Sequence, residues 1–185
     1  MNFTYETPRL YIKVLNENYA PAVLDFLSRN CTVFEPYEAV KPAYYYTDKF
    51  QRTNLRLEYK AFIKSKYARF YVYKKDAPNT IIGTISFSNI LKFPFCSGII
   101  GYKFDKDYHH QGYATEAISC AIHAAFRDSD IHRLTAYVLP DNNSSICLLE
   151  RIGFEFEGLC RKSICICGEY KDHLQYSIID ESNNI

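Results

Sequence analysis

The stretch from residue 105 to residue 117 reads Asp105-Lys-Asp-Tyr-His-His-Gln-Gly-Tyr-Ala-Thr-Glu-Ala117, and it joins a strand-like run to a helix-like run. Gly112 and the small Ala114 stand at the junction. The first N–H groups of a helix have no partner inside the helix, and the aligned peptide dipoles add partial positive charge there. The stretch therefore predicts an anion-binding helix N-terminus, although the same two small residues would also suit close packing of the helix.

The segments before this junction alternate between strand and helix patterns. Residues 9–15 predict a strand, and cap-type residues at 16–18 predict the start of a short helix. Residues 32–47 are expected to be irregular, because Pro36 and Pro42 interrupt them, and residues 48–64 predict a longer helix. Three further strands are expected as an antiparallel meander. They cover residues 69–75, 80–90 and 97–104.

The segments after the junction continue the alternation. Apolar residues, three of them small alanines, recur at helical spacing on one face of the expected helix. They are Ala117, Ile118, Ala121, Ile122 and Ala125. A strand over 134–139 leads through a turn to a helix over 145–152 that ends at Gly153. Two closing strands are expected over 155–167 and 173–179, so the 185 residues predict one α/β domain, 1–185.

The bulk composition excludes several classes of protein. Lys and Arg number 22 against 21 Asp and Glu, so the net charge of +1 gives no field that favours nucleic acid or a membrane surface. The seven Cys residues show no repeated Cys-x-x-Cys spacing, which indicates reduced thiols and no metal site. No leader pattern and no apolar run of about 20 residues is present. The expectation is a cytoplasmic protein, monomer or homodimer, that binds neither nucleic acid nor membrane.

Two motifs in order resemble those of the GNAT superfamily of acyl-CoA N-acyltransferases. The spacing His109-x-x-Gly112-x-Ala114 is similar to its pyrophosphate signature, usually Arg/Gln-x-x-Gly-x-Gly/Ala. Residues 139–154 resemble its strand-turn-helix segment, in which Asn and, three residues later, Ser or Tyr precede a helix closed by Gly-Phe. The opening Glu6-Thr-Pro-Arg-Leu10 and the ending 168–177 resemble the Rim-type branch, the ribosomal-protein-alanine N-acetyltransferases and their relatives.

This resemblance implies a fold and a set of site residues. The fold would be a mixed, mostly antiparallel sheet of six or seven strands, splayed at its centre, with helices on both faces. Acetyl-CoA would enter between residues 97–104 and 134–139. The residues expected to contact it are Tyr102, Phe104, His109, His110, Gln111, Gly112, Tyr113, Ala114, Thr115, Asn142 and Ser145. Ser145 would be the catalytic proton donor, although Asn142 and Ser145 would also serve simply as helix caps.

The sequence departs from the branch at three positions. An aromatic residue is usual at His109 and a glycine at His110, and some relatives carry a glutamate base at the position aligned with Ile164. Without that base, an α-amine, with a pKa near about 7.8, suits the site better than a lysine amine near about 10.4.

The leading hypothesis is therefore acetyl transfer to a protein N-terminal amine, possible examples being ribosomal proteins. The alternatives are a small-molecule amine acetyltransferase, for aminoglycosides or polyamines, and a catalytically silent acyl-CoA-binding module. The residues expected to contact the acceptor all lie in the irregular segment. They are Glu35, Glu38, Tyr44 and Tyr45, the tyrosines being equally suited to fill the core.

Overall fold

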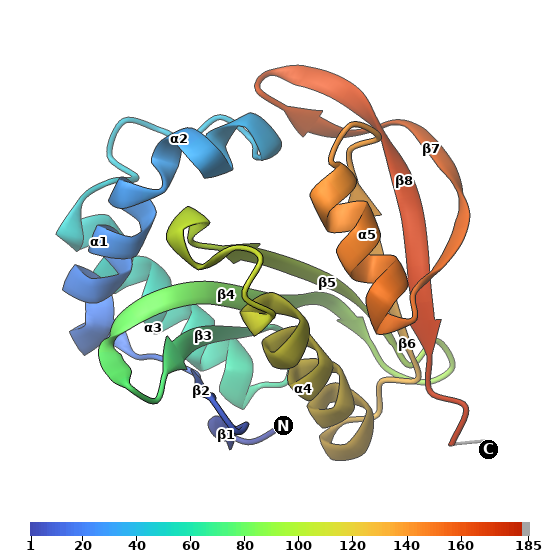
Figure 1. Cartoon of the computed structure of the whole chain (residues 1–185), viewed down its shortest axis with the longest axis horizontal. Coiled ribbons are helices and arrows are strands. Elements are labelled where there is room, and N and C mark those ends of the chain that lie inside the picture. The colour runs from blue at the N-terminus through green and yellow to red at the C-terminus, as the bar shows by residue number, and fades with distance from the viewer. Residues whose placement is uncertain (183–185) are drawn as a thin grey trace.

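The computed structural model describes residues 1–182 and contains one eight-stranded sheet in the order β1-β2-β3-β4-β5-β6-β8-β7 (Figure 1). The strands are β1 Thr4–Glu6, β2 Leu10–Lys13, β3 Ala68–Lys74, β4 Ala77–Leu91, β5 Ser97–Phe104, β6 Arg133–Val138, β7 Glu155–Ile166 and β8 Glu169–Ile179. All neighbours pair antiparallel except β5 and β6. The expected class is confirmed, and the eighth strand is β1, whose three residues are too few for a recognisable alternation.

Helices cover both faces of the sheet. They are α1 Ala20–Arg29, α2 Cys31–Phe34, α3 Asp48–Ile63, α4 Tyr113–Asp128 and α5 Asn143–Ile152, with short 3-10 turns η1 Glu17–Tyr19, η2 Glu35–Tyr37 and η3 Lys106–Tyr108. The segment expected to be irregular thus contains α2 and η2, which are too short to show a helical period. None of the helices within residues 1–182 is both long and apolar enough to cross a membrane.

Two hydrophobic cores lie on opposite faces of the central strands, because successive side chains of a strand point to opposite sides. Phe70, Ile85 and Ile100 belong to the larger core, which also contains the apolar face of α4. Tyr71 and Tyr73, at alternate positions of β3, belong to the smaller core under α1 and α3. In Figure 1, α4 crosses in front of the sheet and α3 lies behind it.

The parallel pair β5 and β6 is the place where the sheet opens. Only three residue pairs join the two strands, and the last of them is Ile99 with Thr135. Beyond this point β5 stays paired with β4 as far as Phe104, while β6 stays paired with β8 as far as Val138. The sheet is therefore splayed between β5 and β6, as the resemblance to the GNAT superfamily implied.

Two strand glycines allow a test of how tightly the sheet is packed at this opening. A methyl group at Gly83 would lie 2.4 Å from the ring of Phe104, the last residue of β5 before the α4 junction. The ring is buried and would have to move, so we expect Gly83→Ala to lower the free energy of unfolding by about 1–3 kcal/mol. Gly98→Ala is the control, because its methyl group would make an ordinary 3.6 Å contact with Leu134. Chemical denaturation measures both, and equal stability of the two variants would contradict the packing.

Candidate active site

The N-terminus of α4 presents unpaired backbone donors. Gly112 is the N-cap, with the left-handed φ of 78°, and Glu116 is the first helical residue whose N–H bonds back, at 3.1 Å, to the carbonyl of Gly112. Within residues 1–182 the N–H groups of residues 112–115 donate to no protein acceptor. His110 also has a left-handed φ, 59°, which explains why the branch usually carries glycine there. The loop therefore offers several N–H groups to an anion.

The opening residues of the chain hold this loop in place. Glu116 Oε2 accepts from Arg9 Nε at 2.6 Å, and its Oε1 accepts from the Thr7 hydroxyl at 2.6 Å. The Arg9 guanidinium also donates to the Gln111 carbonyl at 3.0 Å and lies 4.4 Å from the centre of the Tyr113 ring. Burial raises the pKa of Glu116, but the hydrogen bonds from Thr7 and Arg9 outweigh it and hold the pKa below its ordinary value. The sequence Thr7-Pro8-Arg9 thus contributes to the anion site from a distance of about 100 residues along the chain.

The second motif brings two hydroxyl groups together across the opening. The phenol of Tyr102 on β5 lies 2.7 Å from Ser145 Oγ on α5. Asn142 Oδ1 accepts the backbone N–H of Ser145 at 3.2 Å, so Asn142 is the N-cap of α5. Burial raises the pKa of Tyr102 to about 12, although its hydrogen bond to Ser145 lowers it. Tyr102 is therefore a neutral phenol at neutral pH and can donate to Ser145 Oγ.

A cavity of about 950 Å³ connects these features. Most of the expected cofactor residues line it. They are Tyr102, Phe104, His109, His110, Gly112, Ala114, Thr115, Asn142 and Ser145. Gln111 and Tyr113 do not line it, because Gln111 bonds through its side chain to the Asp107 carbonyl and Tyr113 is buried in the larger core.

The four residues expected to contact the acceptor do not lie together in one cavity. Glu38 lines the large cavity, and Tyr45 lines a second, smaller one. Glu35 lines neither, because it accepts the hydroxyl of Tyr46 at 2.8 Å, and Tyr44 is 62% exposed on the surface. The backbone carbonyl of Glu38 accepts the N–H of Cys167 at 3.3 Å, which ties the segment after η2 to the β7–β8 turn.

The far side of the cavity is polar. Two rows of paired residues cross the neighbouring strands β3, β4 and β5 here. The first row is Arg69, Ser86 and Gly101, and the second is Tyr71, Thr84 and Lys103. Both rows lie on the face of the sheet that α1 and α3 cover. Every residue of the two rows except Tyr71 lines the large cavity. Arg69, Ser86 and Lys103 were not predicted as site residues from the sequence. Alternation within each strand shows which residues share a face, but only the pairing of the three strands brings these side chains together.

Charged groups at the end of the large cavity near Lys103 form ion pairs. Glu38 accepts from Lys103 Nζ at 2.6 Å and from Lys41 Nζ at 3.2 Å. Burial raises the pKa of Glu38, but the two lysines outweigh it, so the pKa lies below its ordinary value. Burial also lowers the pKa of Lys103, against the opposing effect of Glu38. Within residues 1–182, no three His, Cys, Asp or Glu side chains gather in a way that could hold a metal ion.

Comparison with known proteins gives the class. Residues 9–155 match the family described as Acetyltransferase (GNAT) domain. Probable N-acetyltransferase YjcK of Bacillus subtilis is 30% identical over 171 residues, which cover 92% of this chain and 94% of that protein. The chain therefore belongs to the GNAT acetyltransferase family and is an N-acetyltransferase.

Solved structures agree with this assignment. The ribosomal-protein-S5-alanine acetyltransferase from Vibrio fischeri has a TM-score of 0.93 at 27% identity, with 100% of both chains covered. Mycobacterium smegmatis RimJ, solved in complex with CoA-disulfide, has a TM-score of 0.87 at 21% identity over 94% of this chain and 83% of that one, and it shows the same fold. The resemblance to the ribosomal-protein-alanine branch is confirmed.

The contact between Arg9 and Glu116 predicts a pH dependence of stability. The pKa of Glu116 is lower in the folded chain than its ordinary value near about 4.3, so its contribution is present above that pH and is lost as the pH falls below it. We expect Glu116→Gln to be less stable than the wild type at pH 6 and to lose less stability between pH 6 and pH 3. Urea unfolding at both pH values measures this, with the exposed Glu155→Gln as control. Parallel pH profiles for wild type and Glu116→Gln would contradict it.

Proposed function

We propose that this enzyme transfers the acetyl group of acetyl-CoA to the N-terminal α-amine of a protein, of the kind that ribosomal proteins carry. One observation carries the proposal. A single cavity runs from the free N–H groups of α4, past Tyr102 and Ser145, to the polar rows under α1 and α3. A coenzyme at one end and an amine at the other would therefore meet beside the paired hydroxyl groups.

The cavity has features that fit acetyl-CoA. The N–H groups of residues 112–115 suit the coenzyme's diphosphate, which is a dianion at neutral pH. Beyond Ile99 the side of β5 that faces β6 is not paired with it, so its backbone can pair with the amide groups of the pantetheine arm as an added strand would. The CoA-disulfide complex of RimJ, a protein of the same fold, supports this use of the cavity.

The paired hydroxyl groups suit the chemistry of acetyl transfer. The amine nitrogen forms a bond to the acetyl carbon and loses one proton to solvent, while the bond between that carbon and sulfur breaks and the departing thiolate takes up one proton. The group that gives the thiolate its proton regains one from solvent. Ser145 can give the thiolate this proton when Tyr102 is the donor of their hydrogen bond, because the serine hydrogen is then free to point to the sulfur. Tyr102 would thus position and support Ser145. This arrangement favours an active enzyme over a silent binding module.

The charges at the acceptor end favour an α-amine. Glu38 is the only carboxylate among the described residues that line the large cavity, and its two lysine partners make it a poor base. An acceptor that must arrive neutral suits such a site. At neutral pH an α-amine is several hundred times more abundant in its neutral form than a lysine amine, given pKa values of about 7.8 and about 10.4. The alanine acetyltransferase from Vibrio fischeri, similar over the whole chain, supports the same class of acceptor.

A polyamine or an aminoglycoside fits less well. Lys41, Arg69 and Lys103 lie at the acceptor end, against the carboxylates of Glu38 and Glu58. A polycation would meet more positive than negative charge there, and like charges repel in a partly buried site.

The acceptor assignment can be tested with peptides that begin with Ala or Ser. We expect release of CoA with these peptides and a mass increase of one acetyl group on the α-amine. The same peptides with a blocked N-terminus and an internal lysine are the matched controls and should not react. Products only on lysine, on spermidine or on an aminoglycoside would reject the assignment.

The role of the hydroxyl pair can be tested with Ser145→Ala and Tyr102→Phe. We expect Ser145→Ala to lower kcat by about 10²–10⁴-fold and Tyr102→Phe to lower it less, with the KM for acetyl-CoA changed by less than about threefold. Because Tyr102 acts through Ser145, the double variant should be no slower than Ser145→Ala alone. Ser28→Ala, at an exposed position of α1, is the control for the effect of removing a hydroxyl. Equal losses in kcat and in acetyl-CoA affinity would mean that the pair is structural.

A further inference from the structure

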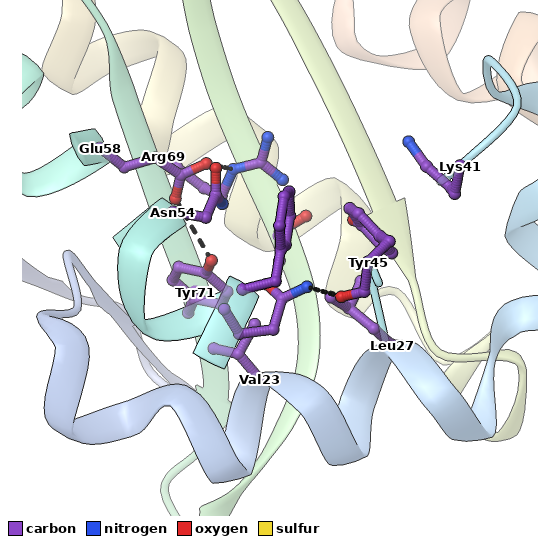
Figure 2. A pocket seen from close by; sticks show the side chains of 11 residues that line it. Val23, Leu27, Lys41, Tyr45, Asn54, Glu58, Arg69 and Tyr71 are labelled. Atoms are coloured by element: carbon purple, nitrogen blue, oxygen red, sulfur yellow. Dashed lines mark hydrogen bonds and ion pairs between the residues drawn. The ribbon is translucent and has the colours of Figure 1, made fainter. Parts of the chain in front are cut away.

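A second cavity, of about 160 Å³, lies next to the large one between α1, α3 and strands β3 and β4 (Figure 2). Arg69 and Thr84 line both cavities, so the two meet at these side chains. The rest of its lining is partly apolar, with Val23 and Leu27 from α1, and partly polar, with Asn54 from α3. A cavity of about 150 Å³ holds a molecule as large as benzene, so this one can hold an amino-acid side chain.

Arg69 is held in a fixed position with donors to spare. Its Nε lies 2.9 Å from Glu58 Oε1, and its Nε and Nη2 donate to the Tyr67 hydroxyl at 2.9 and 2.6 Å. The Tyr71 hydroxyl donates to the other oxygen of Glu58 at 3.4 Å, as Figure 2 shows. Arg69 Nη1 donates to no acceptor among residues 1–182. The guanidinium is therefore oriented by two side chains, Glu58 and Tyr67, while its Nη1 remains available.

Other polar groups of the cavity are available as well. The amide of Asn54 and the hydroxyl of Thr84 have no hydrogen-bond partner among the described residues, although Thr84 is only 3% exposed. Gln51 is different, because its amide nitrogen donates to the carbonyl of Tyr45 at 2.8 Å. Arg69, Asn54 and Thr84, which come from β3, α3 and β4, thus offer polar atoms to the small cavity.

The charges around this space favour an anion. Lys41 and Glu58 line the small cavity, and Lys103 and Glu38 line the adjoining part of the large one. With Arg69 the formal sum is three positive charges and two negative charges. A carboxylate would therefore enter a site with one positive charge in excess, and a guanidinium N–H makes strong, directed hydrogen bonds to carboxylate oxygen.

We infer that the small cavity is an acceptor subsite for a carboxylate side chain, Asp or Glu, carried within the first few residues of the protein substrate. This inference rests on the proposed function, because it assumes that the acceptor is a polypeptide N-terminus. The α-amine would lie in the large cavity, and the carboxylate would pass Thr84 to reach Arg69 Nη1. The same subsite would disfavour a basic side chain, so it would select among N-termini that begin with the same residue.

The test uses peptides that begin with Ala and carry Glu or its neutral isostere Gln at position 2, 3 or 4. For at least one position, we expect kcat/KM of the wild-type enzyme to be about tenfold higher with Glu than with Gln. Acetylation of the peptides with equal rates for Glu and Gln at every position would overturn the subsite and leave the proposed function standing. If no peptide is acetylated, the subsite and the proposed function are both rejected.

Two variants and a control connect the preference to this cavity. Arg69→Gln should reduce the ratio of kcat/KM for Glu and Gln peptides to about one. Asn54→Leu, which fills the cavity from α3 and leaves Arg69 in place, should reduce the ratio too, and it covers the case in which Arg69→Gln does not fold. Arg56→Gln on the exposed side of α3 should keep the wild-type ratio. A ratio that persists in a folded Arg69→Gln or in Asn54→Leu would overturn the inference.

Discussion

The early end of the parallel pairing between β5 and β6 is the constraint on which the rest of this structure depends. After Ile99 and Thr135 each strand remains bonded to its other neighbour, so the sheet stays rigid while its centre is open. The opening lets groups from both faces of the sheet border the same cavity. Tyr102 reaches it from the face of α4 and α5, and Lys103, the next residue, reaches it from the face of α1 and α3.

The groups around the opening are held by contacts from distant parts of the chain. Arg9 and Thr7, next to the first strands, fix Glu116 and thereby the loop before α4. Asn142 fixes the first turn of α5 and with it the position of Ser145. The roles proposed for Ser145 and for the loop before α4 require placement within fractions of an ångström, and rigid elements supply this better than loops do. The stability of the sheet and the geometry of the site are therefore closely linked in this enzyme.

The end of the cavity that we propose for the acceptor is built differently from the end that we propose for the coenzyme. At the coenzyme end, the main contacts available come from the backbone, which suits a ligand shared by a whole family. At the end proposed for the acceptor, side chains of Arg69, Thr84 and Lys103 project from strands, and residues of α2 and η2 line the same cavity. Side chains change more readily than backbone geometry, so this end is where relatives with one chemistry can select different amines.

Most of the helices and strands, and the two motifs at the end of the cavity proposed for the coenzyme, were predictable from the sequence. Strand β5, the helices α3 and α4, the glycine junction and the Asn142–Ser145 turn all follow from local patterns of apolar spacing, glycine and capping residues. The pairing of Tyr102 with Ser145 and the clustering of Arg69, Lys103 and Glu38 were decided only by the tertiary structure. Alternation along a strand tells which residues share a face, but the neighbouring strands and the covering helices decide whether that face meets solvent, core or cavity. For that reason Gln111 and Tyr44, which the sequence predicted as site residues, do not line the cavity. Arg69, which the sequence did not predict, does line it.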